Sequence, residues 1–128
     1  MKNLTYSLLA VAILAIGACK KGENGPVNTL SGRWNLIATY ISTGAPGVWI
    51  AAGNQTHQYV QFNNDGKLLG NAFSDYATYA IKDTAAVVFS KKDNTIQNYR
   101  YAIKKDTLVL SPAGPIFCIE GCALKFTR

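Results

Sequence analysis

An alternation of apolar and polar residues begins near residue 32 and continues to the C-terminus, and it limits the possible folds of this chain more than any other feature. In the first such segment, the residues on the apolar face are Trp34, Leu36, Ala38 and Tyr40. A strand sends successive side chains to opposite faces, whereas a helix repeats every 3.6 residues. The alternation therefore predicts strands and argues against a helical domain.

Turn signals divide the alternating region into short pieces. The strongest is 63–66, Asn-Asn-Asp-Gly, because Asn and Asp tolerate turn conformations and Gly supplies a positive φ. A long loop rich in Gly and Ala is expected over 42–56. The expected strands are at about 33–40, 57–62, 67–71, 76–82, 85–90, 95–104, 107–111 and 122–127.

Short links between strands force antiparallel neighbours, because parallel pairs need long crossover connections. With 128 residues, of which 48% are hydrophobic and 16% charged, the chain has enough apolar material for one domain. The expected fold is all-β, a small eight-stranded antiparallel up-and-down β-barrel. Closure removes unpaired sheet edges, and eight strands leave room for side chains or one small ligand. A bent open sheet is the structural alternative.

The N-terminal segment is typical of an export signal. From Leu8 to Cys19 all twelve residues are apolar or small. As a helix they would span roughly 18 Å, less than the ~30 Å hydrocarbon layer of a membrane, which favours a signal peptide over a membrane anchor.

The end of this segment, Ile16-Gly17-Ala18-Cys19, resembles a bacterial lipobox. The resemblance implies acylation of the Cys19 thiol with fatty acids such as palmitate, and cleavage before Cys19. The chain then divides into a signal peptide, 1–18, a lipidated flexible tether, 19–29, and a folded domain, 30–128. Several acyl chains anchor a protein stably, where a single chain does not. A plain secretory signal with a chance cysteine is the alternative.

The residue after Cys19 bears on the destination of the protein. No Asp follows directly, which in many Gram-negative bacteria favours transport to the outer membrane. The expected location is therefore the cell envelope, lipid-anchored at the outer membrane, with the periplasmic or surface-facing side left open.

The start of the folded domain resembles a lipocalin, whose first strand opens with Gly-x-Trp, here Gly32 and Trp34. The resemblance implies that Trp34 lies at the closed end of the barrel. A basic residue of the last strand, Arg128 or Lys125, would pack over it through a cation–π contact. The resemblance also makes the loop 42–56 a lid over the open mouth.

The order of motifs is similar to that of the small lipocalin-like lipoproteins of Gram-negative bacteria. These motifs are the lipobox, the Gly-x-Trp strand, a hairpin at Phe62–Gly66, a Thr-Leu-x-Leu-Ser strand at Thr107–Ser111 and a final Cys-containing segment at Cys118–Arg128. The small β-domain of heat-shock lipoproteins, which begins with Leu-x-Gly-x-Trp, is a related possibility.

Two cysteines remain once Cys19 is assigned to lipid. These are Cys118 and Cys122. Because an even number of cysteines is left and the expected compartment is oxidising, we expect them to form a disulfide. A metal site needs more ligands, and the single histidine, His57, is remote in sequence. A redox-active pair is usually spaced Cys-x-x-Cys at a helix start, unlike this pair.

Trp49 stands in an apolar stretch, 46–51, of the expected lid loop, although loops normally face water. It either caps the barrel core or contacts a ligand or membrane. Tyrosines can stack on flat ligands and orient them with a hydroxyl, although they also suit an ordinary core or rim. His57 is expected near a rim of the barrel. The candidate ligand-binding residues are Trp49, Tyr40, His57, Tyr59, Tyr79, Tyr99 and Tyr101.

No set of residues in the sequence makes up a catalytic, metal or cofactor site, so an enzyme is not expected. The 13 Lys and Arg exceed the 7 Asp and Glu. However, the lysine pairs at 91–92 and 104–105 are each followed by Asp in a turn, which argues against nucleic acid. The expected function is that of a lipid-anchored protein that binds a small apolar molecule. The alternative is a structural or interaction lipoprotein of the outer membrane with a filled barrel, no ligand and an envelope protein partner. A continuous cavity favours the first, and a filled interior favours the second.

Overall fold

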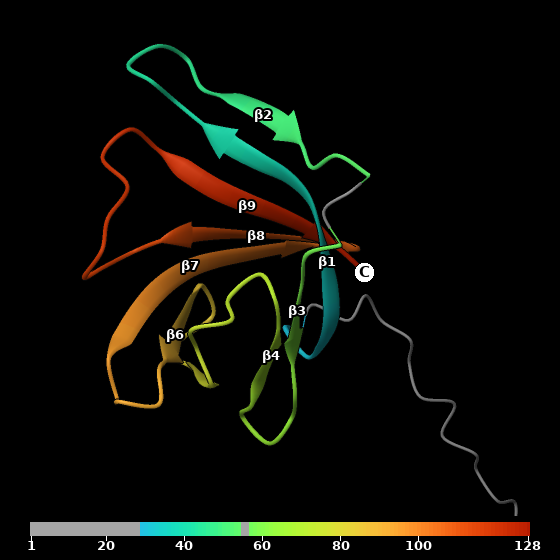
Figure 1. Ribbon diagram of the computed structural model, residues 1–128, viewed down its shortest axis with the longest axis vertical. Coiled ribbons are helices and arrows are strands. Elements are labelled where there is room, and N and C mark those ends of the chain that lie inside the picture. Colours follow the sequence, from blue (N-terminus) through green and yellow to red (C-terminus); the bar gives the residue numbers. More distant parts are fainter. Residues whose placement is uncertain (1–28, 55–56) are drawn as a thin grey trace, which may run out of the picture.

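The computed structural model describes residues 29–54 and 57–128, which form nine strands and no helix (Figure 1). Cys19, the expected signal peptide and nearly all of the expected tether lie outside the described residues. The strands are β1 (Gly32–Ile41), β2 (Val48–Ala51), β3 (Tyr59–Phe62), β4 (Leu68–Gly70), β5 (Thr78–Ile81), β6 (Ala86–Ser90), β7 (Ile96–Lys104), β8 (Thr107–Pro112) and β9 (Cys122–Thr127).

Eight of these strands form one antiparallel sheet in the order β4-β3-β1-β9-β8-β7-β6-β5. The two ends of the sheet meet through a bridge between Lys67 and Thr78. Beside it, the amide of Leu68 donates to the carbonyl of Ala77 at 3.0 Å, and the amide of Tyr79 donates to the carbonyl of Gly66 at 2.9 Å. The sheet therefore curls into a nearly closed barrel, which confirms the all-β barrel expected from the sequence.

The remaining strand, β2, lies within 42–56, where a lid loop was expected, and so corrects that expectation. Val48–Ala51 pairs antiparallel with Ala38–Ile41 of β1 and forms a hairpin beside the upper part of that strand (Figure 1). β1 has ten residues but β3 only four, so β2 supplies backbone partners that β3 cannot reach. All four residues of β2, Val48–Ala51, are apolar and exposed. They do not alternate between apolar and polar, so the alternation in the sequence did not predict a strand here.

A β-bulge in β1 corrects the expected facing of its side chains. The register with β9 shifts between Leu36 and Ala38, so that one residue of β1 is unmatched. Before the shift, Leu36 pairs with the buried Phe126 and faces inward. After it, Thr39 occupies the inner position and Tyr40 turns to the outer face, because a bulge reverses the alternation beyond it.

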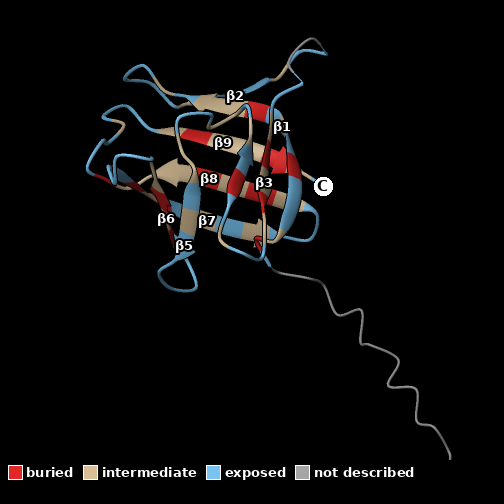
Figure 2. Ribbon diagram, turned by 60° about the horizontal axis from the view of Figure 1, so that its bottom comes forward, coloured by how far each residue is buried: buried red, intermediate tan, exposed pale blue. Residues whose placement is uncertain are grey.

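The barrel interior is packed with large apolar side chains. In Figure 2 most buried positions lie along the strands that surround the interior, and the connecting loops are largely exposed or intermediate. Phe73, from the segment between β4 and β5, adds its ring to this core, at 5.1 Å from Phe89 and 5.4 Å from Tyr99 between ring centroids. The buried core is Leu30, Trp34, Val60, Phe62, Leu68, Val87, Phe89, Tyr99, Leu108, Leu110 and Phe126.

The barrel has two distinct ends. At the closed end, β1 starts at Gly32 and the chain terminates at Arg128. At the open end, Ile41 of β1 pairs with Cys122 of β9 and with Val48 of β2. Figure 1 shows the C-terminus on one side of the barrel and the loops that precede β2 and β9 on the other.

Candidate functional site

The closed end is built around Trp34. Its ring is fully buried, and its Nε1–H donates to the carbonyl of Leu30 at 2.8 Å. The guanidinium carbon of Arg128 lies 4.4 Å from the ring centroid, which is the contact that the lipocalin resemblance implies. The same guanidinium donates to the carbonyls of Thr29, at 2.5 Å, and Ser31, at 3.2 Å. Arg128 therefore joins the last strand to the segment that enters the barrel.

The open end contains a small apolar cavity of about 210 Å³. Its lining includes Thr39, Phe73, Tyr99, Leu110 and Leu124. Pockets for drug-sized ligands usually measure about 300–1,000 Å³, so this cavity is below that range. Burial raises the pKa of the Tyr99 phenol above its ordinary value, and the hydroxyl stays protonated at neutral pH. The mouth of the barrel thus offers a small, largely apolar space and no charge.

The remaining candidate tyrosines do not share this cavity. Tyr59 faces outward under Arg33, whose guanidinium carbon lies 3.7 Å from its ring centroid. Tyr79 packs edge-on against Phe62 at 5.0 Å, and its hydroxyl donates to the carbonyl of Asn63 at 2.8 Å. The Tyr101 hydroxyl donates to the carbonyl of Asp83 at 3.3 Å. The structure therefore distributes these rings over the wall and closed end of the barrel.

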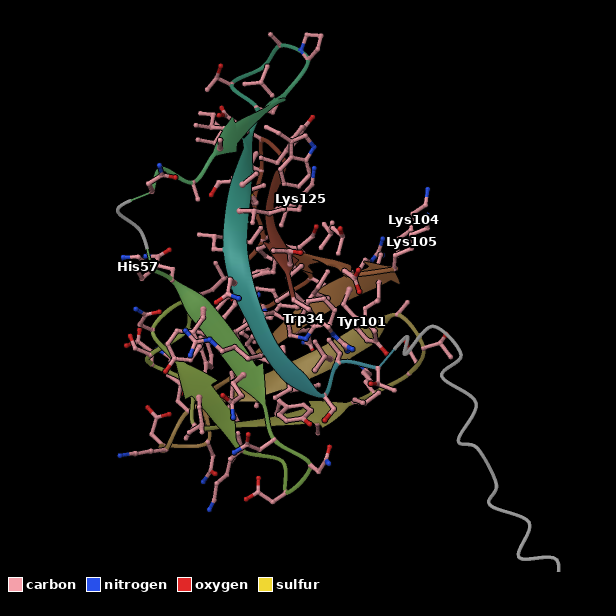
Figure 3. All side chains as sticks on the ribbon, turned by 90° about the vertical axis from the view of Figure 1, so that its right-hand side faces the viewer. Trp34, His57, Tyr101, Lys104, Lys105 and Lys125 are labelled. Atoms are coloured by element: carbon pink, nitrogen blue, oxygen red, sulfur yellow. A yellow bond between two sulfur atoms is a disulfide. The ribbon has the colours of Figure 1, made fainter. Side chains whose placement is uncertain are left out.

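His57 is exposed and lies just before β3. Its backbone carbonyl accepts a hydrogen bond from the side chain of Asn71 at 3.2 Å. Figure 3 shows His57 and Tyr101 on opposite sides of the molecule. Within the part of the chain that the structure describes, His, Cys, Asp and Glu form no group of three that would suit a metal ion.

Tyr40 and Trp49 meet on the outer face of the sheet. They are directly paired across β1 and β2, and their ring centroids are 5.3 Å apart. The ammonium of Lys125, whose side chain lies close to β1 in Figure 3, is 3.9 Å from the centroid of the Trp49 ring. Trp49 is 40% exposed and does not line the mouth cavity, so it neither plugs the core nor lies over the mouth.

The loop that joins β8 to β9 is fixed at two places. Cys118 and Cys122 form the disulfide that the cysteine count predicts, with their Cα atoms 5.8 Å apart. Gln97, which is buried, both donates to the carbonyl of Ile116 at 2.8 Å and accepts from its amide at 3.0 Å. Gly121 adopts a φ of 73°, a conformation that glycine allows without strain. We call residues 113–121 the disulfide loop.

The outer face between the Tyr40–Trp49 pair and the disulfide loop is hollowed into a groove of about 640 Å³, which we call the outer groove. Sequence analysis singles out four of its residues, Tyr40, Trp49, Cys118 and Cys122, and misses the others. No local pattern marks those others, because strands far apart in sequence bring them together. The lining residues are Tyr40, Trp49, Arg100, Ser111, Pro112, Ala113, Phe117, Cys118, Gly121, Cys122 and Ala123.

No family model matches the chain, and neither a curated protein nor a solved structure matches it. Among residues 29–54 and 57–128, no helix has the length and hydrophobicity needed to cross a membrane. We therefore infer the function from the fold and from the chemistry of the closed end, the mouth cavity and the outer groove.

Proposed function

We propose that this protein is a lipid-anchored lipoprotein of the cell envelope whose barrel is an interaction module. Acylated Cys19 holds the chain at the membrane, and the barrel contacts an envelope protein through its surface. The proposal combines the lipobox-like segment that ends at Cys19 with the packing of the barrel.

The filled interior is the observation that carries this proposal. Trp34, Phe62, Phe89 and Phe126 each have at most 1% of their surface exposed. Phe73 adds a further ring to the same core from outside the strand ladder. A barrel of eight strands is just wide enough for its own side chains, and these side chains use the space that a ligand would need.

The open end is the surface that favours a protein partner. Exposed apolar side chains gather in the disulfide loop, where Phe117 is 67% exposed and Ile119 is 98% exposed. The described chain begins at the closed end, at Thr29, so the open end lies on the side of the barrel away from Thr29. Apolar side chains exposed in one region mark interaction surfaces more often than scattered ones do.

Replacement of Cys19 by serine tests the anchor. A serine hydroxyl does not replace the thiol as the acylation site, so we expect the variant to lose its acyl chains and to leave the membrane fraction or stall unprocessed. Mass spectrometry of the N-terminal peptide and membrane fractionation give the result. A Cys19→Ser variant that is processed and still sediments with membranes would contradict the lipobox interpretation.

Site-specific photo-crosslinking tests the interaction surface. A photoreactive residue at Ile119 in the producing cell should give a discrete adduct with an envelope protein. The matched position is Lys104, at the closed end, which should give no such adduct. Equal adducts from both positions, or none from Ile119, would argue against docking through the open end.

The cavity of about 210 Å³ at the mouth favours a second candidate function, the binding of a small apolar molecule. Native mass spectrometry of protein from the producing cell would detect a carried ligand as added mass. The variant Leu124→Trp, which fills the cavity, is the control and should abolish that added mass. A carried ligand that disappears in this variant would give ligand binding precedence over docking.

A further inference from the structure

The floor and walls of the outer groove come from one row of residues across five strands. Arg100 of β7 pairs with Ser111 of β8, and Ala123 of β9 pairs with Tyr40 of β1, which in turn pairs with Trp49 of β2. Leu110 of β8 pairs with Leu124 of β9. Because these two strands are antiparallel, the next residues along them, Ser111 and Ala123, lie side by side in the row. Two small residues thus form a floor between a guanidinium and an aromatic pair.

The charge of this row is positive. The guanidinium of Arg100 is exposed, and within the described residues it has no hydrogen bond or ion pair. None of the residues that line the groove is Asp or Glu, while the Lys125 ammonium lies beside the groove on Trp49. An unpaired cation at a hollow favours an anionic ligand, because guanidinium groups bind carboxylates, sulfonates and phosphates through paired hydrogen bonds.

The aromatic wall is held in place before any ligand arrives. Tyr40 lies against the backbone of Gly47, where a Cβ atom would overlap its ring. A Cβ at Gly121, on the disulfide loop, would be in ordinary van der Waals contact with the same ring, at 3.6 Å. Gln97 fixes the disulfide loop in turn. A wall that is already ordered loses little conformational entropy on binding.

We propose that the outer groove binds a small anion with a planar apolar ring. The ring lies on Tyr40 and Trp49, and the anionic group reaches Arg100. Three inter-strand spacings separate the Cα atoms of Arg100 and Tyr40 by about 14 Å, and both side chains line the groove between them. The groove shares Pro112, Cys122 and Ala123 with the lining of the mouth cavity, whereas the three residues proposed to hold the ligand line the groove alone.

A pair of matched probes tests the proposal. Naphthalene-2-sulfonate carries a ring and a charge, and naphthalene-2-sulfonamide carries the same ring without the charge. Both are titrated calorimetrically into the full chain in phosphatidylcholine nanodiscs, with empty nanodiscs as the blank. We expect the sulfonate to bind more tightly, and Arg100→Gln to weaken it about fivefold while the affinity for the sulfonamide is unchanged.

Two further variants separate the charge from the ring. Trp49→Ala should weaken both probes, and Trp49→Phe should restore them, because phenylalanine retains a planar surface. Lys92→Gln removes an exposed cation outside the groove and should change neither probe. Equal affinity of the two probes for the unmodified chain, or a sulfonate affinity that Arg100→Gln leaves intact, would overturn the proposal.

Discussion

Replacing Trp34 by alanine should lower the free energy of unfolding by about 3–5 kcal/mol, because the removed ring leaves a large cavity at the closed end. The ring is fully buried, and the surrounding β1, β3 and β9 cannot move inward without breaking their pairing. The variant also loses the hydrogen bond to Leu30 and the contact with Arg128. Urea unfolding followed by circular dichroism measures the change.

Trp49→Ala is the matched control for this experiment, since Trp49 is 40% exposed on the outer face. We expect it to cost about 1–2 kcal/mol, because partly exposed rings bury less apolar area. Equal losses for the two tryptophan variants would contradict the assignment of Trp34 as the structural centre of the closed end.

Phe73→Ala should destabilise the protein by about 2–4 kcal/mol, somewhat less than a fully buried ring would. Its ring stands against Phe89, Tyr99 and Phe126, with centroids 5.1, 5.4 and 6.2 Å away. Removal would leave those rings without one face of contact and would enlarge the mouth cavity. Thermal and urea unfolding give the stability.

Phe117→Ala provides the comparison, because that ring is 67% exposed and its removal should change stability little. A Phe73→Ala variant as stable as the unmodified protein would show that the segment between β4 and β5 does not hold the core. If the variant also acquires affinity for small apolar molecules, Phe73 is the residue that keeps the barrel from acting as a container.

Much of the barrel was predictable because its determinants are local. Val60 and Phe62 alternate with Tyr59 and Gln61, and the structure buries the first two as the alternation requires. The carboxylate of Asp93 accepts a hydrogen bond from the amide of Thr95, two residues along the chain. This bond lowers the pKa of that carboxyl, and it needs no distant partner to form.

Eight of the nine strands, most of the turns and the pairing of Cys118 with Cys122 could be predicted from the amino-acid sequence, because each depends on residues close together in the chain. The outward turn of Tyr40 at the bulge in β1, and its meeting with Trp49 of β2, became evident only from the folded chain. The groove between Tyr40 and Arg100 likewise depends on registers among five strands. Such registers follow from packing between strands distant in sequence, about which local alternation carries no information.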